Sequence, residues 1–283
     1  MSAGNKILRK NGFKRVSIGS GQPHVALITG IHGDEKSPLI IAEYAKNLPI
    51  SNGTLHIFFE VNQKACKKNV RYVNYDLNRI FPGKSQGTYE EVLAYSLLNE
   101  LDGMDYVIDV HSFNMDSNIY TICNLDTVEL ARSFLPDALW LLDLDEIKYE
   151  GTMYYHLSRL KIPNMVIELP SLECVTKDHI LKIRNCIDNL FQYIGILDGF
   201  PDKKIIPTYK RSLVYAPRNG IFIPYKKINE TVESGDELGI LIDEEYNEVG
   251  IFAKERGVLI QIRHPSIVHP LETIYALGER VDL

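Results

Sequence analysis

In residues 25–38 the chain reads VALITGIHGDEKSP, an apolar run that stops at a glycine and continues into a polar loop. Residues 25–29 predict a short buried strand. Ser37 and Pro38 predict the start of a helix, because serine is a favoured cap and proline fits the first turn. His32 and Glu35 therefore lie on a strand-to-helix loop, where open α/β sheets form their ligand crevice. The His-x-x-Glu spacing alone is weak evidence, so a metal site requires a third ligand.

Two further predicted strands end in residues that commonly bind metal ions. The run 106–110 is followed by His111, and the run 164–167 by Glu168. Taken singly, these two are better explained as a hydrogen-bonded buried histidine and a salt-bridged carboxylate. Together with the His-x-x-Glu pair, they match a catalytic zinc site of two histidines and one carboxylate, which leaves the second carboxylate free to act as a base.

Residues 61–83 are polar, lack regular periodicity and end at a Pro-Gly turn, so we expect a long ordered loop. With this loop, the motifs resemble those of the succinylglutamate desuccinylase and aspartoacylase family, a branch of the zinc carboxypeptidase group. The matching motifs occur in the family's order within residues 31–170: HGDE at 32–35, the segment 71–83 with DLNRIF at 76–81, DVH at 109–111 and IE at 167–168.

The resemblance implies roles for the matching residues. It implies one zinc ion per chain, held by His32, Glu35 and His111. It implies that Glu168 is the general base and acid and that Arg71 polarises the scissile carbonyl. Asn78 and Arg79 would then bind a carboxylate of the substrate. Amide hydrolysis suits this set, because zinc gives water a pKa near ~7 and an arginine stabilises the developing oxyanion.

Three other residues have weaker assignments. Tyr155 and Arg159 lie four residues apart on a predicted short helix, and they resemble a substrate-contacting Tyr and Arg of aspartoacylase-like enzymes. Their spacing to the glutamate differs from the aspartoacylase spacing, and the alternative is a surface arginine stacked on a tyrosine. Asp109 lies two residues before His111 on the same strand face, where it either orients that imidazole or caps a turn.

The predicted fold is α/β, a mixed sheet flanked by helices as in zinc carboxypeptidases, followed by a small all-β domain. We place the catalytic domain at residues 1–200 and the β domain at 205–283, because helical periodicity disappears after a linker-like stretch at 198–204. The β domain is similar to biotinyl and lipoyl carrier barrels, but residues 243–248 contain no carrier lysine. Helices are predicted at 88–101, 127–135, 152–159 and 177–194, and C-terminal strands at 213–216, 220–224, 237–243, 249–253 and 257–263.

Composition limits the partners and the compartment. The formal net charge of −6 and the lack of clustered Lys and Arg argue against nucleic acid. No stretch approaches the ~18 apolar residues of a membrane span, and residues 1–6 lack the apolar core of a leader. The four scattered cysteines favour a reducing cytoplasm. A homo-oligomer is compatible with the sequence, which does not determine the oligomeric state.

These observations predict a zinc-dependent amidohydrolase that removes the acyl group of an N-acyl amino acid or a related small molecule bearing a carboxylate. A zinc carboxypeptidase acting on short peptides is the first alternative, because the same residue types serve both reactions. The second is a metal-binding protein without turnover whose β domain recruits a partner. A purely structural zinc site would have four protein ligands, which disfavours the second alternative.

Overall fold

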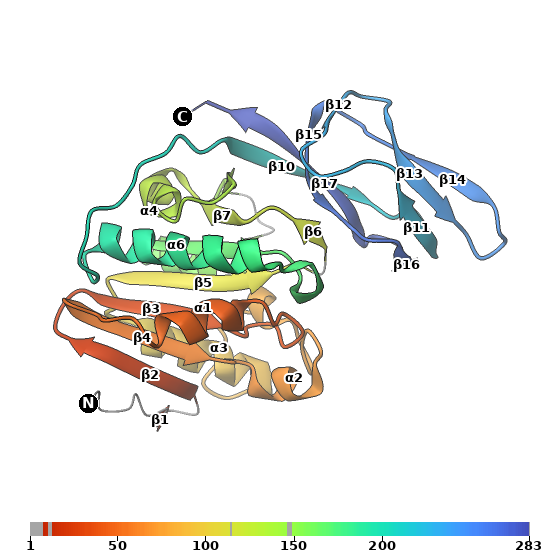
Figure 1. Ribbon diagram of the computed structural model, residues 1–283. Coiled ribbons are helices and arrows are strands. Elements are labelled where there is room, and N and C mark those ends of the chain that lie inside the picture. The colour runs from red at the N-terminus through yellow and green to blue at the C-terminus, as the bar shows by residue number, and fades with distance from the viewer. Residues whose placement is uncertain (1–7, 11–12, 114, 146–148, 283) are drawn as a thin grey trace.

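The computed structural model describes residues 8–10, 13–113, 115–145 and 149–282, so the amino-terminal residues 1–6, where no leader is predicted, lie outside the described residues. Within these ranges, thirteen strands form one mixed sheet in the order β1-β2-β4-β3-β5-β9-β7-β8-β10-β17-β15-β12, with β6 beside β15 (Figure 1). The strands that precede residue 200 are β1 (Leu8–Lys10), β2 (Phe13–Ser20), β3 (His24–Thr29), β4 (Gly53–Phe59), β5 (Tyr106–Ser112), β6 (Asp116–Ser117), β7 (Tyr120–Cys123), β8 (Ala138–Leu141) and β9 (Asn164–Leu169).

The centre of the sheet consists of parallel strands with continuous apolar runs. β4, β3, β5 and β9 are parallel neighbours, and their carboxyl ends therefore meet at one edge. Five of the six residues of β3 are buried. Strands covered on both faces require such runs rather than an alternating pattern. The three strands predicted for the site, at residues 25–29, 106–110 and 164–167, correspond to β3, β5 and β9.

Helices cover both faces of this sheet, as Figure 1 shows. α1, α4 and α6 share one hydrophobic cluster with Val25, Leu27 and Ile108, whereas α3 and α5 share another with Ala26 and Ile28. The alternation of β3 side chains between the clusters follows from the two-residue period of a strand. The helices are α1 (Pro38–Ala45), α2 (Gln63–Lys68), α3 (Tyr89–Leu101), α4 (Val128–Ser133), α5 (Met153–Arg159) and α6 (Lys177–Ile194), with 3-10 turns η1 (Leu77–Arg79), η2 (Leu125–Thr127) and η4 (Leu172–Cys174).

Two local expectations need correction. Ser37 precedes α1 as predicted, but its side chain makes no capping hydrogen bond. Its hydroxyl instead donates to the carbonyl of Pro170 (2.8 Å). The segment 61–83, predicted as a long loop, contains the short helix α2. The side chain of Asn62 caps this helix by accepting a hydrogen bond from the amide of Ala65. A helix of six residues is too short for its periodicity to be visible in the sequence.

The C-terminal strands belong to two sheets. β10 lies parallel to β8, so that β10, β17, β15 and β12 continue the main sheet, and a separate four-stranded antiparallel sheet has the order β14-β13-β11-β16. These strands surround their own apolar cluster, which includes Phe222 and Tyr275. The α/β fold with a small C-terminal β region is thereby confirmed, whereas the boundary between residues 200 and 205 stays a prediction. The C-terminal strands are β10 (Thr208–Tyr215), β11 (Gly220–Pro224), β12 (Thr231–Val232), β13 (Glu237–Ile242), β14 (Glu248–Phe252), β15 (Gly257–Ile262), β16 (Ser266–Val268) and β17 (Thr273–Val281).

None of the helices within the described part of the chain has the length and apolar character that crossing a bilayer requires.

Candidate active site

Two elements supply a group of three buried side chains. His32 and Glu35 lie on the loop between β3 and α1, and His111 lies in β5. Gly33 makes this loop possible, because a Cβ there would lie 2.1 Å from the backbone carbon of Ala65. The relative exposures of His32, Glu35 and His111 are 3%, 7% and 4%. The loop is thus held tightly against α2 with its ligand-type side chains turned inward.

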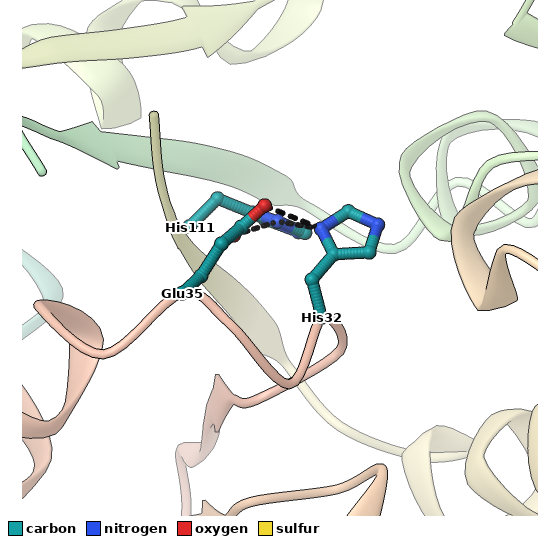
Figure 2. A group of neighbouring side chains, drawn as sticks. All are labelled: His32, Glu35 and His111. Atoms are coloured by element: carbon teal, nitrogen blue, oxygen red, sulfur yellow. Dashed lines mark hydrogen bonds and ion pairs between the residues drawn. The ribbon is translucent and has the colours of Figure 1, made fainter. Parts of the chain in front are cut away.

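The three side chains point toward one another, as Figure 2 shows. Nδ1 of His32 lies 2.6 Å from Oε1 of Glu35, and Nδ1 of His111 lies 2.9 Å from Oε2 of the same carboxylate. The two Nδ1 atoms are 3.2 Å apart. Among the described residues, these three form the group of His, Cys, Asp and Glu side chains whose donor atoms are close enough to hold a metal ion.

Two outer carboxylates fix the orientation of the imidazoles. Nε2 of His32 donates to Oδ1 of Asp76 (3.0 Å), and Nε2 of His111 donates to Oδ2 of Asp109 (2.9 Å). A carboxylate only accepts, so each Nε2 carries a hydrogen, and each Nδ1 is the nitrogen that faces the carboxylate of Glu35 at the centre. Metal-ligating histidines are typically oriented in this way. Two imidazole nitrogens and a carboxylate that converge at these distances can hold a cation once their shared protons are released.

The shifted pKa values of His111 and Glu35 agree with this geometry. Burial alone lowers the pKa of His111, but Asp109 and Glu35 outweigh burial and raise that pKa well above its ordinary value. Burial alone raises the pKa of Glu35, but the two histidines outweigh it, so that this pKa lies well below its usual range. The site therefore favours a positive charge at its centre, which is supplied by protons when no metal is bound.

Arg71 lies beside this group. Its Nη1 donates to Oε1 of Glu35 (3.2 Å), and its Nε donates to Oδ2 of Asp76 (3.0 Å). Asp76 thus contacts both an imidazole and the guanidinium. The DLNRIF motif at residues 76–81 begins with Asp76, but the sequence alone assigns this residue no role. Its position in that motif, two residues before Asn78, was the available signal.

Glu168 faces the same space from the neighbouring strand. It pairs in register with His111, so that their side chains share one face of the sheet. Its Oε2 is buried and has no hydrogen-bond partner among the described residues. Burial raises the pKa of Glu168 to about 7. A carboxylate with such a pKa is suited to accept and return a proton near neutral pH.

A cavity of about 300 Å³ opens in front of these residues. Asn78 and Arg79 line it together with Arg71 and Glu168, and the roles that the sequence analysis gives these residues stay predictions. Tyr155 and Arg159 are not among its lining residues, and the Arg159 guanidinium carbon lies 6.0 Å from the centroid of the Tyr155 ring. Contact of those two with a substrate stays a prediction.

The far end of the cavity consists of residues that the sequence did not identify. Trp140 of β8 and two arginines of the C-terminal region, Arg211 and Arg263, line this end. The Arg211 guanidinium carbon lies 3.2 Å from the centroid of the Trp140 ring. No sequence motif surrounds Arg211, so only the pairing of β10 with β8 reveals its place.

Comparison with known proteins assigns the chain to a family. The model of the succinylglutamate desuccinylase/aspartoacylase catalytic domain matches residues 21–194, which is more than half of the chain and includes all three buried ligand-type residues. The chain belongs to the succinylglutamate desuccinylase/aspartoacylase family. The resemblance of its motifs to this family is thereby confirmed. Members of this family are zinc-dependent deacylases that act on N-acyl amino acid-like small molecules.

Several solved structures share the fold along nearly the whole chain. An aspartoacylase family protein from Mesorhizobium loti is 23% identical with a TM-score of 0.80, covering 95% of this chain and 89% of that protein. A succinylglutamate desuccinylase/aspartoacylase from Rhodobacter sphaeroides is 23% identical with a TM-score of 0.82 and the same coverage. The product-bound ectoine utilization protein EutE (DoeB) from Ruegeria pomeroyi is 19% identical with a TM-score of 0.84, covering 93% and 88%. These similarities extend the shared fold into the C-terminal strands.

No protein with a curated description matches the sequence significantly.

Proposed function

We propose that this protein is a zinc-dependent deacylase that hydrolyses the amide bond of an N-acyl amino acid, or of a related small molecule that bears a carboxylate. One observation supports this most directly. Two imidazoles and a carboxylate converge beside Glu168, whose buried Oε2 has no hydrogen-bond partner in the part of the chain that the structure describes. Zinc held by His32, Glu35 and His111 would supply Lewis acidity that activates water and polarises a carbonyl.

The side chains around this group would perform the remaining steps. Glu168 would accept a proton from the attacking water and return it to the leaving amine, which contributes roughly 10² to 10⁴ in rate. Arg71 would donate to the oxygen of the tetrahedral intermediate, because its guanidinium remains charged and offers several donors. Asn78 already accepts a hydrogen bond from the amide of Met153 (3.0 Å), which orients its side chain.

Arg79 would bind the carboxylate of the amino acid part. It lines the cavity, and its Nη1 donates to the carbonyl oxygen of Asn78 (2.7 Å), which leaves further donors of the fork for a ligand. Arg79→Lys should reduce kcat/KM for carboxylate substrates by roughly ten- to a hundredfold, with a smaller effect on the matching carboxamides. Equal hydrolysis of both substrate types by the wild-type enzyme would remove this role.

The cavity volume favours a deacylase over a carboxypeptidase. About 300 Å³ is at the small end of the range for ligand pockets, and residues of the C-terminal strands line its far end. A compact N-acyl amino acid suits this space better than an extended peptide. A carboxypeptidase that accepts short peptides remains the second candidate, since the same zinc ligands, base and arginines serve both reactions.

A paired assay of metal and activity tests the proposal. Purified protein should contain about one zinc per chain and hydrolyse N-acyl amino acids faster than dipeptides or tripeptides. His111→Ala should lose most of the metal and the activity, whereas His269→Ala, an exposed histidine in the C-terminal region, should keep both. Stoichiometric metal without turnover of either substrate class would instead favour a non-catalytic metal-binding protein.

A further inference from the structure

A cysteine and a histidine from distant segments meet outside the candidate active site. Cys174 is the last residue of the 3-10 turn η4, which follows β9, and His264 lies between β15 and β16 in the C-terminal region. Sγ of Cys174 lies 2.9 Å from Nε2 of His264. A thiol within hydrogen-bond reach of an imidazole can transfer its proton to that imidazole and become a nucleophile.

A third side chain directs the thiol hydrogen toward the imidazole. The hydroxyl of Ser171 donates a hydrogen bond to Sγ of Cys174 (3.1 Å). The sulfur is therefore an acceptor on the side of Ser171, and its own hydrogen is free to point at Nε2 of His264. Once the proton has moved, the hydroxyl and Nε2–H both donate to the thiolate. Hydrogen bonds to the charged form of a group favour that form.

The other three of the four cysteines are unsuited to such chemistry. Cys66, Cys123 and Cys186 are buried, and burial raises the pKa of their thiols to about 11, about 12 and about 11, respectively. Cys174 is half-buried and its neighbour His264 is exposed. Because the thiolate is the reactive form and a reagent must reach it, we expect fast reaction at Cys174 and slow reaction at the other three.

The Cys174 and His264 pair also joins two segments that border the cavity. Cys174 belongs to the segment that follows Glu168, and His264 comes directly after Arg263. Glu168 and Arg263 both line the cavity. A new covalent bond at Sγ takes the place of one of its present contacts, so a group attached to Cys174 would change how these two segments meet.

We propose that Cys174 and His264 form a modification site, at which Cys174 exchanges with a small-molecule disulfide. The inference does not depend on the proposed deacylation. The Cys174 thiolate attacks one sulfur of the disulfide, so that a bond from Sγ to this sulfur forms and the original S–S bond breaks. The second sulfur leaves as a thiolate and takes up a proton. Cys174 is thereby oxidised to a mixed disulfide, and the leaving thiol is the reduced product.

Dithiodipyridine tests the site, because each exchange releases a thiopyridone that is measured by its absorbance. Native protein, as purified with its metal, should release one equivalent per chain in a fast phase at pH 7, and Cys174→Ser should abolish this phase. His264→Gln should slow it by roughly tenfold, because less of the thiol is then ionised. After treatment of native protein with oxidised glutathione, mass spectrometry of its peptides should locate the adduct on Cys174.

A second pH separates ionisation of the thiol from access to it. At about pH 10 most of an ordinary cysteine, with a pKa of about 8.5, is ionised without a base, so His264→Gln should then react nearly as fast as the wild type. A difference that persists at both pH values would mean that the imidazole only holds the segment in place. His269→Gln is the matched control, because His269 is exposed in the same region and contacts Asn219. It should react as the wild type does at either pH.

Three results would overturn the proposal. A fast phase that survives Cys174→Ser would place the reactive thiol elsewhere, equal rates for the wild type and His264→Gln at pH 7 would remove the base, and a difference that persists at pH 10 would make the contact merely structural. Melting temperatures of the same samples exclude a folding defect, and Cys174→Ala replaces Cys174→Ser if the serine variant does not fold. Because thiopyridone release requires no hydrolysis, failure of this inference is distinguishable from failure of the proposed function.

Discussion

The two ends of the cavity differ in how completely their polar groups are paired. At the metal end, each nitrogen of His32 and His111 and each oxygen of Glu35 has a partner within 3.2 Å. At the far end, Nε of Arg211 has no partner among the described residues, and the guanidinium lies against the ring of Trp140. A fully paired group is fixed before a ligand arrives, whereas an incompletely paired one is completed by the ligand. We therefore expect the first end to determine the reaction and the second to select the substrate.

Glu168→Gln gives the largest effect expected at the metal end. A carboxamide cannot accept the proton, so kcat should fall by roughly 10² to 10⁴ for mono- and dicarboxylate substrates alike. Zinc content by atomic absorption and the melting temperature should remain those of the wild type. Glu173→Gln, at an exposed glutamate of η4, provides the matched control. Loss of zinc in Glu168→Gln would mean that Glu168 is a ligand.

Arg71→Ala should lower kcat by roughly 10² to 10³, the usual loss for one oxyanion donor. The fall should again be the same for mono- and dicarboxylate substrates. Steady-state kinetics on one monocarboxylate and one dicarboxylate N-acyl substrate measures it, with Lys68→Ala as a control at an exposed position of the same segment. If Arg71→Ala alters only the discrimination between substrates, then the two ends do not divide the work as we propose.

Asp109→Asn tests whether the outer carboxylates matter to the metal. Asparagine keeps an acceptor for Nε2 of His111 but removes the negative charge, so zinc affinity should fall by about ten- to a hundredfold. Competition with a chromophoric chelator gives the affinity. Because asparagine caps turns as well as aspartate does, a role of Asp109 in capping alone predicts an unchanged zinc affinity.

The pH dependence of zinc binding gives the smallest effect. In the metal-free protein the pKa of His111 is raised well above its ordinary value, because Asp109 and Glu35 outweigh burial. Below that raised pKa a proton occupies the site and must be displaced, so affinity should rise with pH, by about tenfold per unit for each proton released. Calorimetry in buffers of different ionisation enthalpy counts these protons. Affinity that is independent of pH would contradict the assigned ligands.

The sequence predicts the metal end of the cavity far better than the end lined by Trp140 and Arg211. Buried parallel strands have apolar runs that end visibly, so polar residues such as His111 and Glu168 stand out at their ends. The convergence of these residues with the His-x-x-Glu pair followed from parallel neighbours sharing an edge. Their roles as zinc ligands and base stay proposals.

The far end could not be predicted because it depends on pairing between distant segments. Nothing in residues 208–215 distinguishes Arg211 from any arginine of a β-strand. It reaches the cavity because β10 pairs with β8 across about 70 positions of sequence. β17 was missed as well, since its end contains Glu279 and Arg280, which do not look like a strand buried at the centre of a sheet. Local sequence patterns indicate which residues are buried, but the order of strands in a sheet depends on the whole chain.

The continuous sheet has a consequence for the length of the substrate. His111 and Arg211 lie on strands of one sheet, in the order β5-β9-β7-β8-β10, and neighbouring strands are held about 4.8 Å apart by their hydrogen bonds. Such a sheet resists compression, so its strands fix the distance between the metal group and the part of the cavity wall formed by β8 and β10. In a homologous series of N-acyl substrates, hydrolysis should therefore peak at one acyl chain length and decline on both sides of it.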